Sequence, residues 1–164
     1  MASDPEGGLG VEESRVEMTE LVMPQEINPL GSVFGGWVMA LMDKAAAMAA
    51  TRHCRGPVAT ASVDSIDFLA PMNLGHIVLL SAFLTQTFRT SMEVEVVVHS
   101  EDPLTGEHVK TCSAYFTMVS LGSDGHPRTA PALKLVSQEE KRRGSEAEQR
   151  RRQRLARRGI GSSA

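Results

Sequence analysis

Apolar and polar residues alternate along several stretches of the chain, a pattern typical of half-buried β-strands. In the clearest stretch, Ser91–His99, the apolar residues at even positions would face one side of a sheet, and Glu93 and Glu95 the other. A short turn at Phe88–Thr90 joins this stretch to the one before it, so the strands should pair antiparallel. The pattern predicts five strands, at about residues 14–22, Val58–Phe68, Ile77–Phe88, Ser91–His99 and Val109–Leu121.

One longer stretch, residues 33–51, is apolar on most sides of a helix. Asp43 and Lys44 are its only charged residues, and charges at its centre would make a membrane-spanning helix unfavourable. The stretch therefore predicts a helix wrapped by the rest of the protein and ended by the turn Arg55–Pro57. The order β-α-β-β-β-β predicts an α+β fold, in which one long helix packs against one curved antiparallel sheet.

The chain has 164 residues, which suits a single domain with tails, and its formal net charge of −3 hides an uneven distribution. Residues 1–20 carry six acids and one base, whereas residues 138–158 carry nine bases and four acids. The basic segment has no interleaved aromatic residues, so it does not predict nucleic-acid binding. We expect a flexible acidic N-terminus (1–13), one domain (14–136) and a charged, arginine-rich C-terminal helix or tail (137–164) that is solvated.

The two cysteines, Cys54 and Cys112, do not form a Cys-x-x-Cys pair, and only His53 adjoins either of them as a possible metal ligand. They predict reduced, partly buried thiols in a cytosolic protein and no metal site. The N-terminal residues lack a basic segment followed by an apolar one, so no secretory signal peptide is predicted.

Asp43 is the most informative residue for chemistry, because a carboxylate on so apolar a helix needs a partner or a solvated cavity. It is either a satisfied structural aspartate, in the core or at an interface, or a catalytic base or nucleophile. The residue pattern alone leaves both interpretations open.

The pair Gly35-Gly36 stands at the start of the predicted helix, two turns before Asp43. Glycines there expose backbone N–H groups, which together with the helix dipole can hold an anion or a developing oxyanion. Close packing of the helix end explains the pair equally well. The serine-hydrolase motif Gly-x-Ser-x-Gly and the phosphate-binding motif GxxxxGK[ST] are both absent from the sequence.

With these features in place, the chain resembles the hot-dog-fold acyl-CoA thioesterases, in the YciA-like branch that is related to the brain-type acyl-CoA hydrolases. The resemblance covers about residues 14–136 and extends loosely into the arginine-rich tail. It rests on blocks that occur in the family's order, at Asn28–Trp37, Leu41–Asp43, Val63–Pro71, Arg89–Val94 and Ala114–Val119.

The resemblance implies a hot-dog fold that forms a homodimer, often assembled into a trimer of dimers, with the active site between protomers. By motif position, Asp43 matches the essential acid, and Asn28 matches a polar loop residue that faces the acid of the other subunit. Gly36 matches the backbone N–H that polarises the thioester carbonyl. Residues that match the border of the acyl-CoA site are Gly35, Arg89, Thr90 and Ser91.

The implied function is hydrolysis of acyl-CoA to a fatty acid and coenzyme A in the cytoplasm. Asp43 would activate water or attack directly to give an anhydride, Asn28 would orient water or carbonyl, and Gly36 would stabilise the oxyanion. Coenzyme A enters only as part of the substrate, and no other cofactor, metal, nucleic acid or membrane is implied. The arginine-rich tail could approach the phosphates of coenzyme A.

Two alternatives remain. An enoyl-thioester hydratase of the same fold usually pairs a catalytic histidine with an acid, and the absence of histidine between Asn28 and Met48 counts against it. A non-catalytic acyl-CoA sensor or scaffold could keep the fold without the reaction. The joint presence of Asn28, the glycine pair and Asp43 disfavours this alternative.

Overall fold

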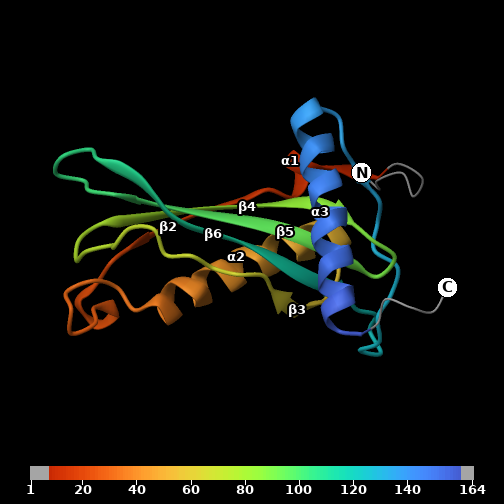
Figure 1. Cartoon of the computed structure of the whole chain (residues 1–164), viewed down its shortest axis with the longest axis horizontal. Helices are drawn as coiled ribbons and strands as arrows, with labels where there is room; N and C mark the ends of the chain where they lie inside the picture. Colours follow the sequence, from red (N-terminus) through yellow and green to blue (C-terminus); the bar gives the residue numbers. More distant parts are fainter. Residues whose placement is uncertain (1–7, 160–164) are drawn as a thin grey trace.

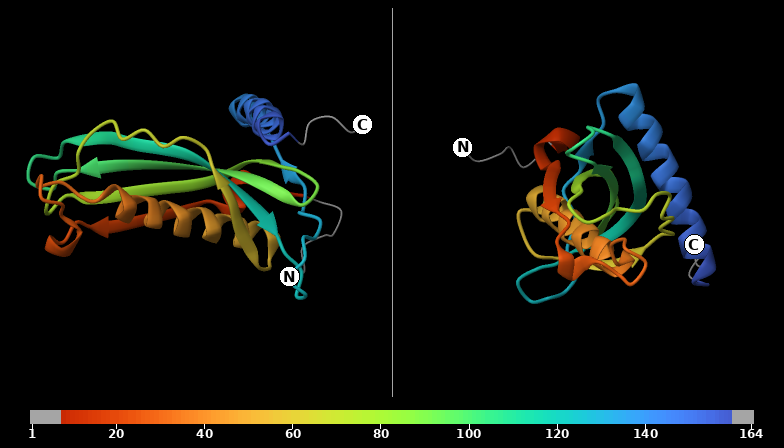
Figure 2. Two further views of the ribbon diagram at one scale, coloured as in Figure 1. Left: turned by 60° about the horizontal axis from the view of Figure 1, so that its bottom comes forward. Right: turned by 90° about the vertical axis from the view of Figure 1, so that its left-hand side faces the viewer.

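The computed structural model describes residues 8–159, in which a long helix, α2, lies inside a curved five-stranded antiparallel sheet (Figures 1 and 2). The strands lie side by side in the order β2-β4-β5-β6-β3, and α2 contacts all five. This arrangement confirms the predicted α+β hot-dog architecture. The sheet and its helix consist of β2 (Val16–Leu21), α2 (Gly35–Cys54), β3 (Val58–Val63), β4 (Ile77–Thr87), β5 (Ser91–Glu101) and β6 (His108–Ser120).

The core lies between α2 and the concave face of the sheet. The four apolar residues at even positions of β5, from Met92 to Val98, are fully buried, as the alternation predicts. Small side chains on α2, such as Ala46 and Ala49, let the sheet approach the helix closely. Burial of each larger apolar side chain stabilises the fold by about 1.5–3 kcal/mol, so this packing supplies most of the attachment of α2.

Helix α2 ends where the sequence predicts. Arg55 caps it in the left-handed conformation, with φ +50°, and donates its N–H to the carbonyl of Thr51. Glycine is the usual residue at such a position. Gly56 follows, and a side chain on it would collide with the guanidinium of Arg128. Pro57 comes next and directly precedes β3.

The predicted strand Val58–Phe68 is too long, because β3 ends at Val63. A β-bulge lies inside it, where the register with β6 shifts between Thr60 and Ser62. Beyond Val63 the segment stays near β6 through isolated backbone hydrogen bonds, including the one from Asp64 N–H to the carbonyl of Tyr115. The bulge weakens the hydrogen-bond ladder between β3 and β6 locally, and the alternation of apolar and polar residues does not predict it.

The segments outside the sheet differ from the expectation of flexible or solvated tails. Residues 1–7 of the predicted flexible N-terminus lie outside the described residues, but residues 9–14 are ordered, with Val11 and Ser14 buried. The C-terminal segment is a helix that packs on the outer face of the sheet and buries Gly144 and Ala147. These elements are β1 (Leu9–Gly10), α1 (Val11–Ser14), the 3₁₀ helix η1 (Pro24–Glu26), β7 (Leu133–Lys134) and α3 (Gln138–Arg157).

Both cysteines are free and buried, as expected, and burial raises the pKa of each thiol. Along residues 8–159, no helix combines the length and the apolar character that crossing a membrane requires.

Candidate active site

Asp43 lies near the middle of α2, on the side that faces the edge strand β3. Its side chain is exposed in the single chain, and its Oδ1 accepts a hydrogen bond from Thr60 Oγ1 at 2.6 Å. The carboxylate is therefore oriented by a neighbouring strand but stays open to solvent, a substrate or another subunit. This geometry rules out a core aspartate and leaves the interface and catalytic interpretations.

Thr60 is a candidate site residue that the sequence did not single out. It lies opposite Met118, a core residue of β6, so its side chain points to the inner face of the sheet towards α2. The bulge that follows Thr60 changes which residues of β3 share this face. The sequence carries no signal for the bulge, and only the register of the strands reveals the role of Thr60.

The two glycines at the start of α2 differ in their surroundings. A Cβ on Gly35 would lie 3.2 Å from the ring of Phe68, so Gly35 allows close packing of this ring. A Cβ on Gly36 would meet no atom within 4 Å, so packing within the chain does not require a glycine there. Glycine in a helix costs about 0.5–1 kcal/mol relative to alanine. The packing interpretation therefore applies to Gly35, whereas Gly36 leaves open space beside the helix N-terminus.

Gly36 and Asp43 lie on the same side of α2. Seven residues separate them, which corresponds to about two turns and ~10 Å along the axis. The helix dipole favours negative charge near Gly36.

Asn28 is placed in the loop before α2 and bonds within that loop. Its Oδ1 accepts from the N–H of Leu30 at 2.8 Å, and its Nδ2 donates to the carbonyl of Val33 at 3.3 Å. In the single chain these bonds organise the turn that leads into α2, and Asn28 is not among the partners of Asp43.

Arg89, Thr90 and Ser91 lie at the opposite end of the helix from Gly36. Arg89 and Thr90 belong to the turn between β4 and β5, and Ser91 begins β5. The next residue, Met92, contacts Cys54 at the end of α2 with a sulfur–sulfur distance of 3.7 Å. Twenty residues of α-helix span about 30 Å. One chain therefore divides the predicted site residues into two groups, one at each end of α2.

The surface around Asp43 is unusually apolar for a solvent-exposed face. Strand β3 is at the edge of the sheet, and its residues 59–61 are exposed without the charges that commonly block edge pairing. Hollows of about 450 and 560 Å³ occur elsewhere on the chain, but Asp43, Asn28 and Gly36 line neither. Large apolar side chains exposed along this face and its borders are Phe34, Met39, Val63 and Phe68.

Within the described residues, no group of three or more histidine, cysteine or acidic side chains is arranged to hold a metal ion. His53 belongs to α2 but lies ten residues beyond Asp43. Its Nε2 donates to the carbonyl of Pro131 at 3.0 Å, and burial lowers its pKa. His53 is therefore in no position to act with Asp43 on one substrate.

Comparison with known proteins agrees with this geometry. Residues 30–107 match the family model of the thioesterase superfamily. The chain is 38% identical over 128 residues to the uncharacterized acyl-CoA thioester hydrolase YkhA of Bacillus subtilis, covering 78% of this chain and 74% of that protein. It is also 38% identical over 140 residues to the mouse cytosolic acyl coenzyme A thioester hydrolase, but it spans only 36% of that longer protein.

Solved structures resemble the whole described fold. A hexameric acyl-CoA thioesterase in its apo form superposes with a TM-score of 0.89 at 41% identity, covering 93% of this chain and 99% of the other. The acyl-CoA hydrolase of Staphylococcus aureus, solved with butyryl coenzyme A and coenzyme A, gives a TM-score of 0.84 at 34% identity and covers 92% of each chain.

Variants of the Staphylococcus enzyme have also been solved, in which an aspartate, a threonine or an asparagine is replaced by alanine. The Bacillus relative and the hexameric and Staphylococcus structures each match most of this chain and most of their own length. The chain therefore belongs to the thioesterase superfamily, within its family of hot-dog-fold acyl-CoA thioester hydrolases.

Proposed function

We propose that this protein hydrolyses the thioester bond of acyl-CoA to give a free fatty acid and coenzyme A, with Asp43 as the essential carboxylate. The observation that carries the proposal is the solvent-accessible Asp43, oriented by Thr60 at 2.6 Å and two turns from the open N-terminus of α2. Family membership adds the substrate class.

The chemistry of a thioester suits these groups. Its carbonyl carbon is more electrophilic than that of an ester, and a thiolate leaves readily, so the reaction needs an activated water and a stabilised oxyanion. Thr60 donates to Oδ1 of Asp43, which leaves Oδ2 to accept a proton from water or to attack the carbonyl carbon itself. The oxyanion would be stabilised by the helix dipole and N–H of the partner subunit's Gly36, because Gly36 and Asp43 of one chain, ~10 Å apart, cannot both reach one carbonyl group. Collapse of the tetrahedral intermediate expels the thiolate, which takes up the proton that Asp43 accepted from water. If Asp43 has attacked directly, water then hydrolyses the anhydride, which releases the fatty acid, restores the carboxylate and supplies the proton for the thiolate.

A homodimer completes the site in this proposal. The site residues at the two ends of α2 cannot reach one substrate carbonyl within a chain, but the partner's loop can bring Asn28 to Asp43. The apolar face around Asp43 and the unpaired edge of β3 supply a surface for such a partner. Assembly into a trimer of dimers is supported by hexameric relatives.

A cytoplasmic location and a role in fatty acid metabolism complete the proposal. Two free, buried cysteines fit a reducing compartment, and the mouse relative is named as cytosolic.

The activity is tested by thiol release from a panel of acyl-CoAs from short to long chains. Asp43→Asn should lower kcat by about 10²–10⁴-fold while leaving the folded state intact, since the side chain is exposed. Near-normal turnover by this variant would remove Asp43 from the mechanism. Absence of release by the wild type on every chain length would favour the acyl-CoA sensor.

The dimer is tested by light scattering at decreasing protein concentration. Met39 is exposed one turn before Asp43, so Met39→Glu should shift the protein towards monomers and lower its activity in parallel. Leu104 is exposed in the hairpin between β5 and β6, and Leu104→Glu is the matched control for an added charge. Monomeric wild-type protein with full activity would contradict a shared site.

A further inference from the structure

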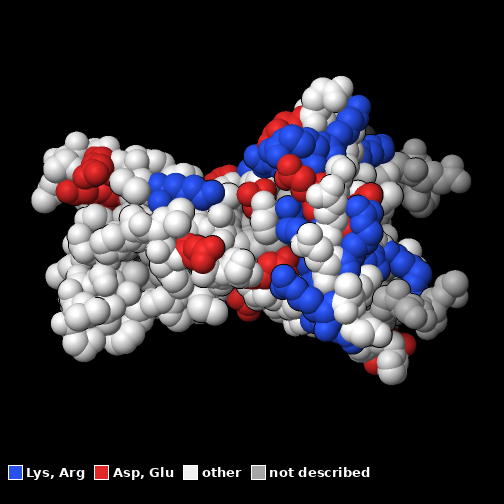
Figure 3. Space-filling view, in the orientation of Figure 1, with Lys and Arg blue, Asp and Glu red and all other residues white. Residues whose placement is uncertain are grey.

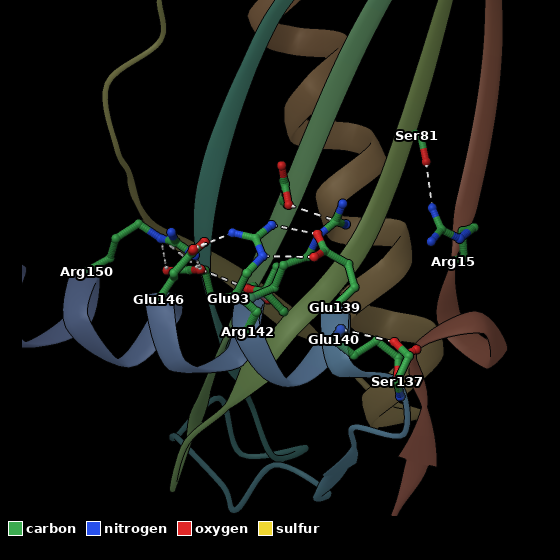
Figure 4. Close-up of polar contacts among 12 residues, drawn as sticks. Arg15, Ser81, Glu93, Ser137, Glu139, Glu140, Arg142, Glu146 and Arg150 are labelled. Carbon is green, nitrogen blue, oxygen red and sulfur yellow. Dashed lines mark hydrogen bonds and ion pairs between the residues drawn. The ribbon is translucent and has the colours of Figure 1, made fainter.

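Helix α3 crosses the outer face of the sheet, on the side opposite to α2 (Figure 2). Its arginines form the strongest concentration of positive charge on the face drawn in Figure 3. Beneath it lies Glu93, whose side chain is fully buried on β5. Its Oε1 accepts hydrogen bonds from Thr85 Oγ1 at 2.8 Å and from Arg150 of α3 at 2.7 Å (Figure 4). An unpaired buried carboxylate would be strongly unfavourable, so this pair attaches α3 to the sheet.

One helical turn further along α3, a second arginine reaches the end of β3. Arg154 Nη1 lies 2.9 Å from Asp64 Oδ2, with exposed side-chain fractions of 13% and 28%. Asp64 comes directly after β3, and its own N–H donates to the carbonyl of Tyr115. The ion pair therefore joins α3 to the strand that carries Thr60.

The bulge in β3 places Thr60 and Asp64, the residue that follows the strand, on opposite faces of the sheet. Residues 60 and 64 would point to the same face of a regular strand. Because Ala61 is an extra residue in the register with β6, Thr60 lies opposite the inward Met118, whereas Asp64 lies beside Tyr115 on the outer face. Thr60 thus orients Asp43 on one side, while Arg154 holds Asp64 on the other.

Few other side-chain bonds hold this part of β3. The hydroxyls of Ser62 and Thr117 face each other across β3 and β6 beneath α3, and within the described residues neither has a hydrogen-bond partner. The segment that leaves Asp64 also brings Phe68 against Gly35 at the start of α2. The end of β3 therefore borders the site at two points, Thr60 and Phe68. Its backbone pairs with β6, and the Asp64 side chain links it to α3.

We propose that Arg154 and Asp64 are positioning residues for hydrolysis: their ion pair holds the bulged end of β3 so that Thr60 meets Asp43 and Phe68 covers the start of α2. The inference rests on the proposed thioesterase function and assigns α3 a part in it. Neither side chain needs to touch the substrate.

The first test compares Arg154→Gln, Asp64→Asn and the double variant with Arg142→Gln. Arg142 is on the same helix, but among residues 8–159 its ion pairs are with Glu139 and Glu146 of α3 alone, so it is the matched control. Small displacements of reacting groups can lower rates by up to about 10²-fold. We expect each single variant to lower kcat by about 10-fold or more with KM nearly unchanged, and the double variant to lose no more than the worse single one. Arg154→Lys should recover part of the rate.

The second test asks whether the effect travels through Thr60. Thr60→Val removes the hydroxyl that reaches Asp43, so adding Arg154→Gln to it should lower kcat little further. Kinetics at two salt concentrations and melting temperatures accompany every variant.

Several results would overturn the proposal. One is a kcat for Arg154→Gln equal to that of Arg142→Gln. Another is a Thr60→Val/Arg154→Gln double variant whose fold-loss in kcat equals the product of the two single fold-losses. A rise in KM alone that depends on salt would assign Arg154 to phosphate binding instead. Inactive wild-type protein would remove the proposed function and this inference together, whereas active wild type with unaffected variants would remove only the inference.

Discussion

Helices α2 and α3 are both twenty residues long and lie on opposite faces of the same sheet, yet different forces attach them. Helix α2 buries apolar residues along most of its length, such as Val38, Met42 and Ala46, and needs no ion pair to stay in place. Helix α3 buries only Gly144 and Ala147.

Arginine side chains do for α3 what apolar packing does for α2. Arg150 pairs with Glu93 and also lies over the ring of Tyr115, 3.6 Å from its centroid. Arg151 lies over Phe88 at 4.2 Å. Guanidinium groups combine charge with a flat apolar face, so they can attach a polar helix to a sheet. Packing should therefore make α2 insensitive to salt, whereas α3 should depend on a few specific pairs.

Breaking the principal pair of α3 should give the largest change. Arg150→Met removes the nearer of two arginines from the buried Glu93 carboxylate and leaves Arg154 at 3.9 Å. Loss of one partner destabilises typical buried pairs by about 3–5 kcal/mol. We expect the lower end of this range because the Arg150 side chain is 21% exposed. Urea denaturation and hydrogen exchange along α3 measure the loss. The double variant Glu93→Gln/Arg150→Met should recover much of it, and wild-type stability of Arg150→Met would show that packing holds α3 as it holds α2.

Overpacking should affect α2 next. Ala46 is fully buried against the sheet, so Ala46→Leu has no space for its added atoms and should destabilise by about 1–3 kcal/mol. Ala156→Leu on the exposed side of α3 is the control and should change stability by less than about 0.5 kcal/mol. Equal effects of the two substitutions in thermal denaturation would contradict the difference in packing.

The buried histidine of α2 should add a smaller, pH-dependent effect. Burial lowers the pKa of His53 below its usual 6.5, so the unfolded state binds more protons in the interval between the two pKa values. Stability should therefore rise with pH through this interval and fall as pH drops below about 6.5. His53→Gln keeps a donor for Pro131 and should flatten this part of the pH–stability curve, measured between pH 5 and 8. A curve identical to that of the wild type would show that His53 is not a source of the dependence.

The smallest effect is expected for the exposed arginine pairs of α3. Arg142→Gln breaks ion pairs with Glu139 and Glu146 that lie on the solvent side of the helix. Such pairs contribute about 0–1 kcal/mol, and high salt should abolish even this difference in melting temperature. A loss as large as that of Arg150→Met would mean that charge holds α3 regardless of burial.

The elements with a regular spacing of apolar residues along the sequence were predictable. The apolar helix, the alternation in β5 and the turn after Cys54 all follow from local periodicity, and the structure confirms them. The bulge at Ala61 was not predictable, since one extra residue leaves no trace in composition. The inward position of Thr60 and the early end of β3 could therefore not be predicted either.

The docking of the C-terminal helix on the sheet could not be predicted from the sequence either. Its composition is that of a solvated helix, and the segment 137–164 was expected to be one. It docks because Glu93 and Asp64 happen to lie beneath it, residues that are 57 and 90 positions away along the chain. Complementary charges at such separations come together only when the sheet has formed.

The sequence by itself determined which helix and strands form the core, the order of these elements and Asp43 as the candidate acid, because these depend on residue type and local spacing. Only the tertiary structure decided what orients that acid and what holds α3. It also decided that Gly35 packs against a ring whereas Gly36 borders open space. Those outcomes depend on strand register and on contacts between distant residues, which are properties of three-dimensional packing and have no counterpart in local sequence periodicity.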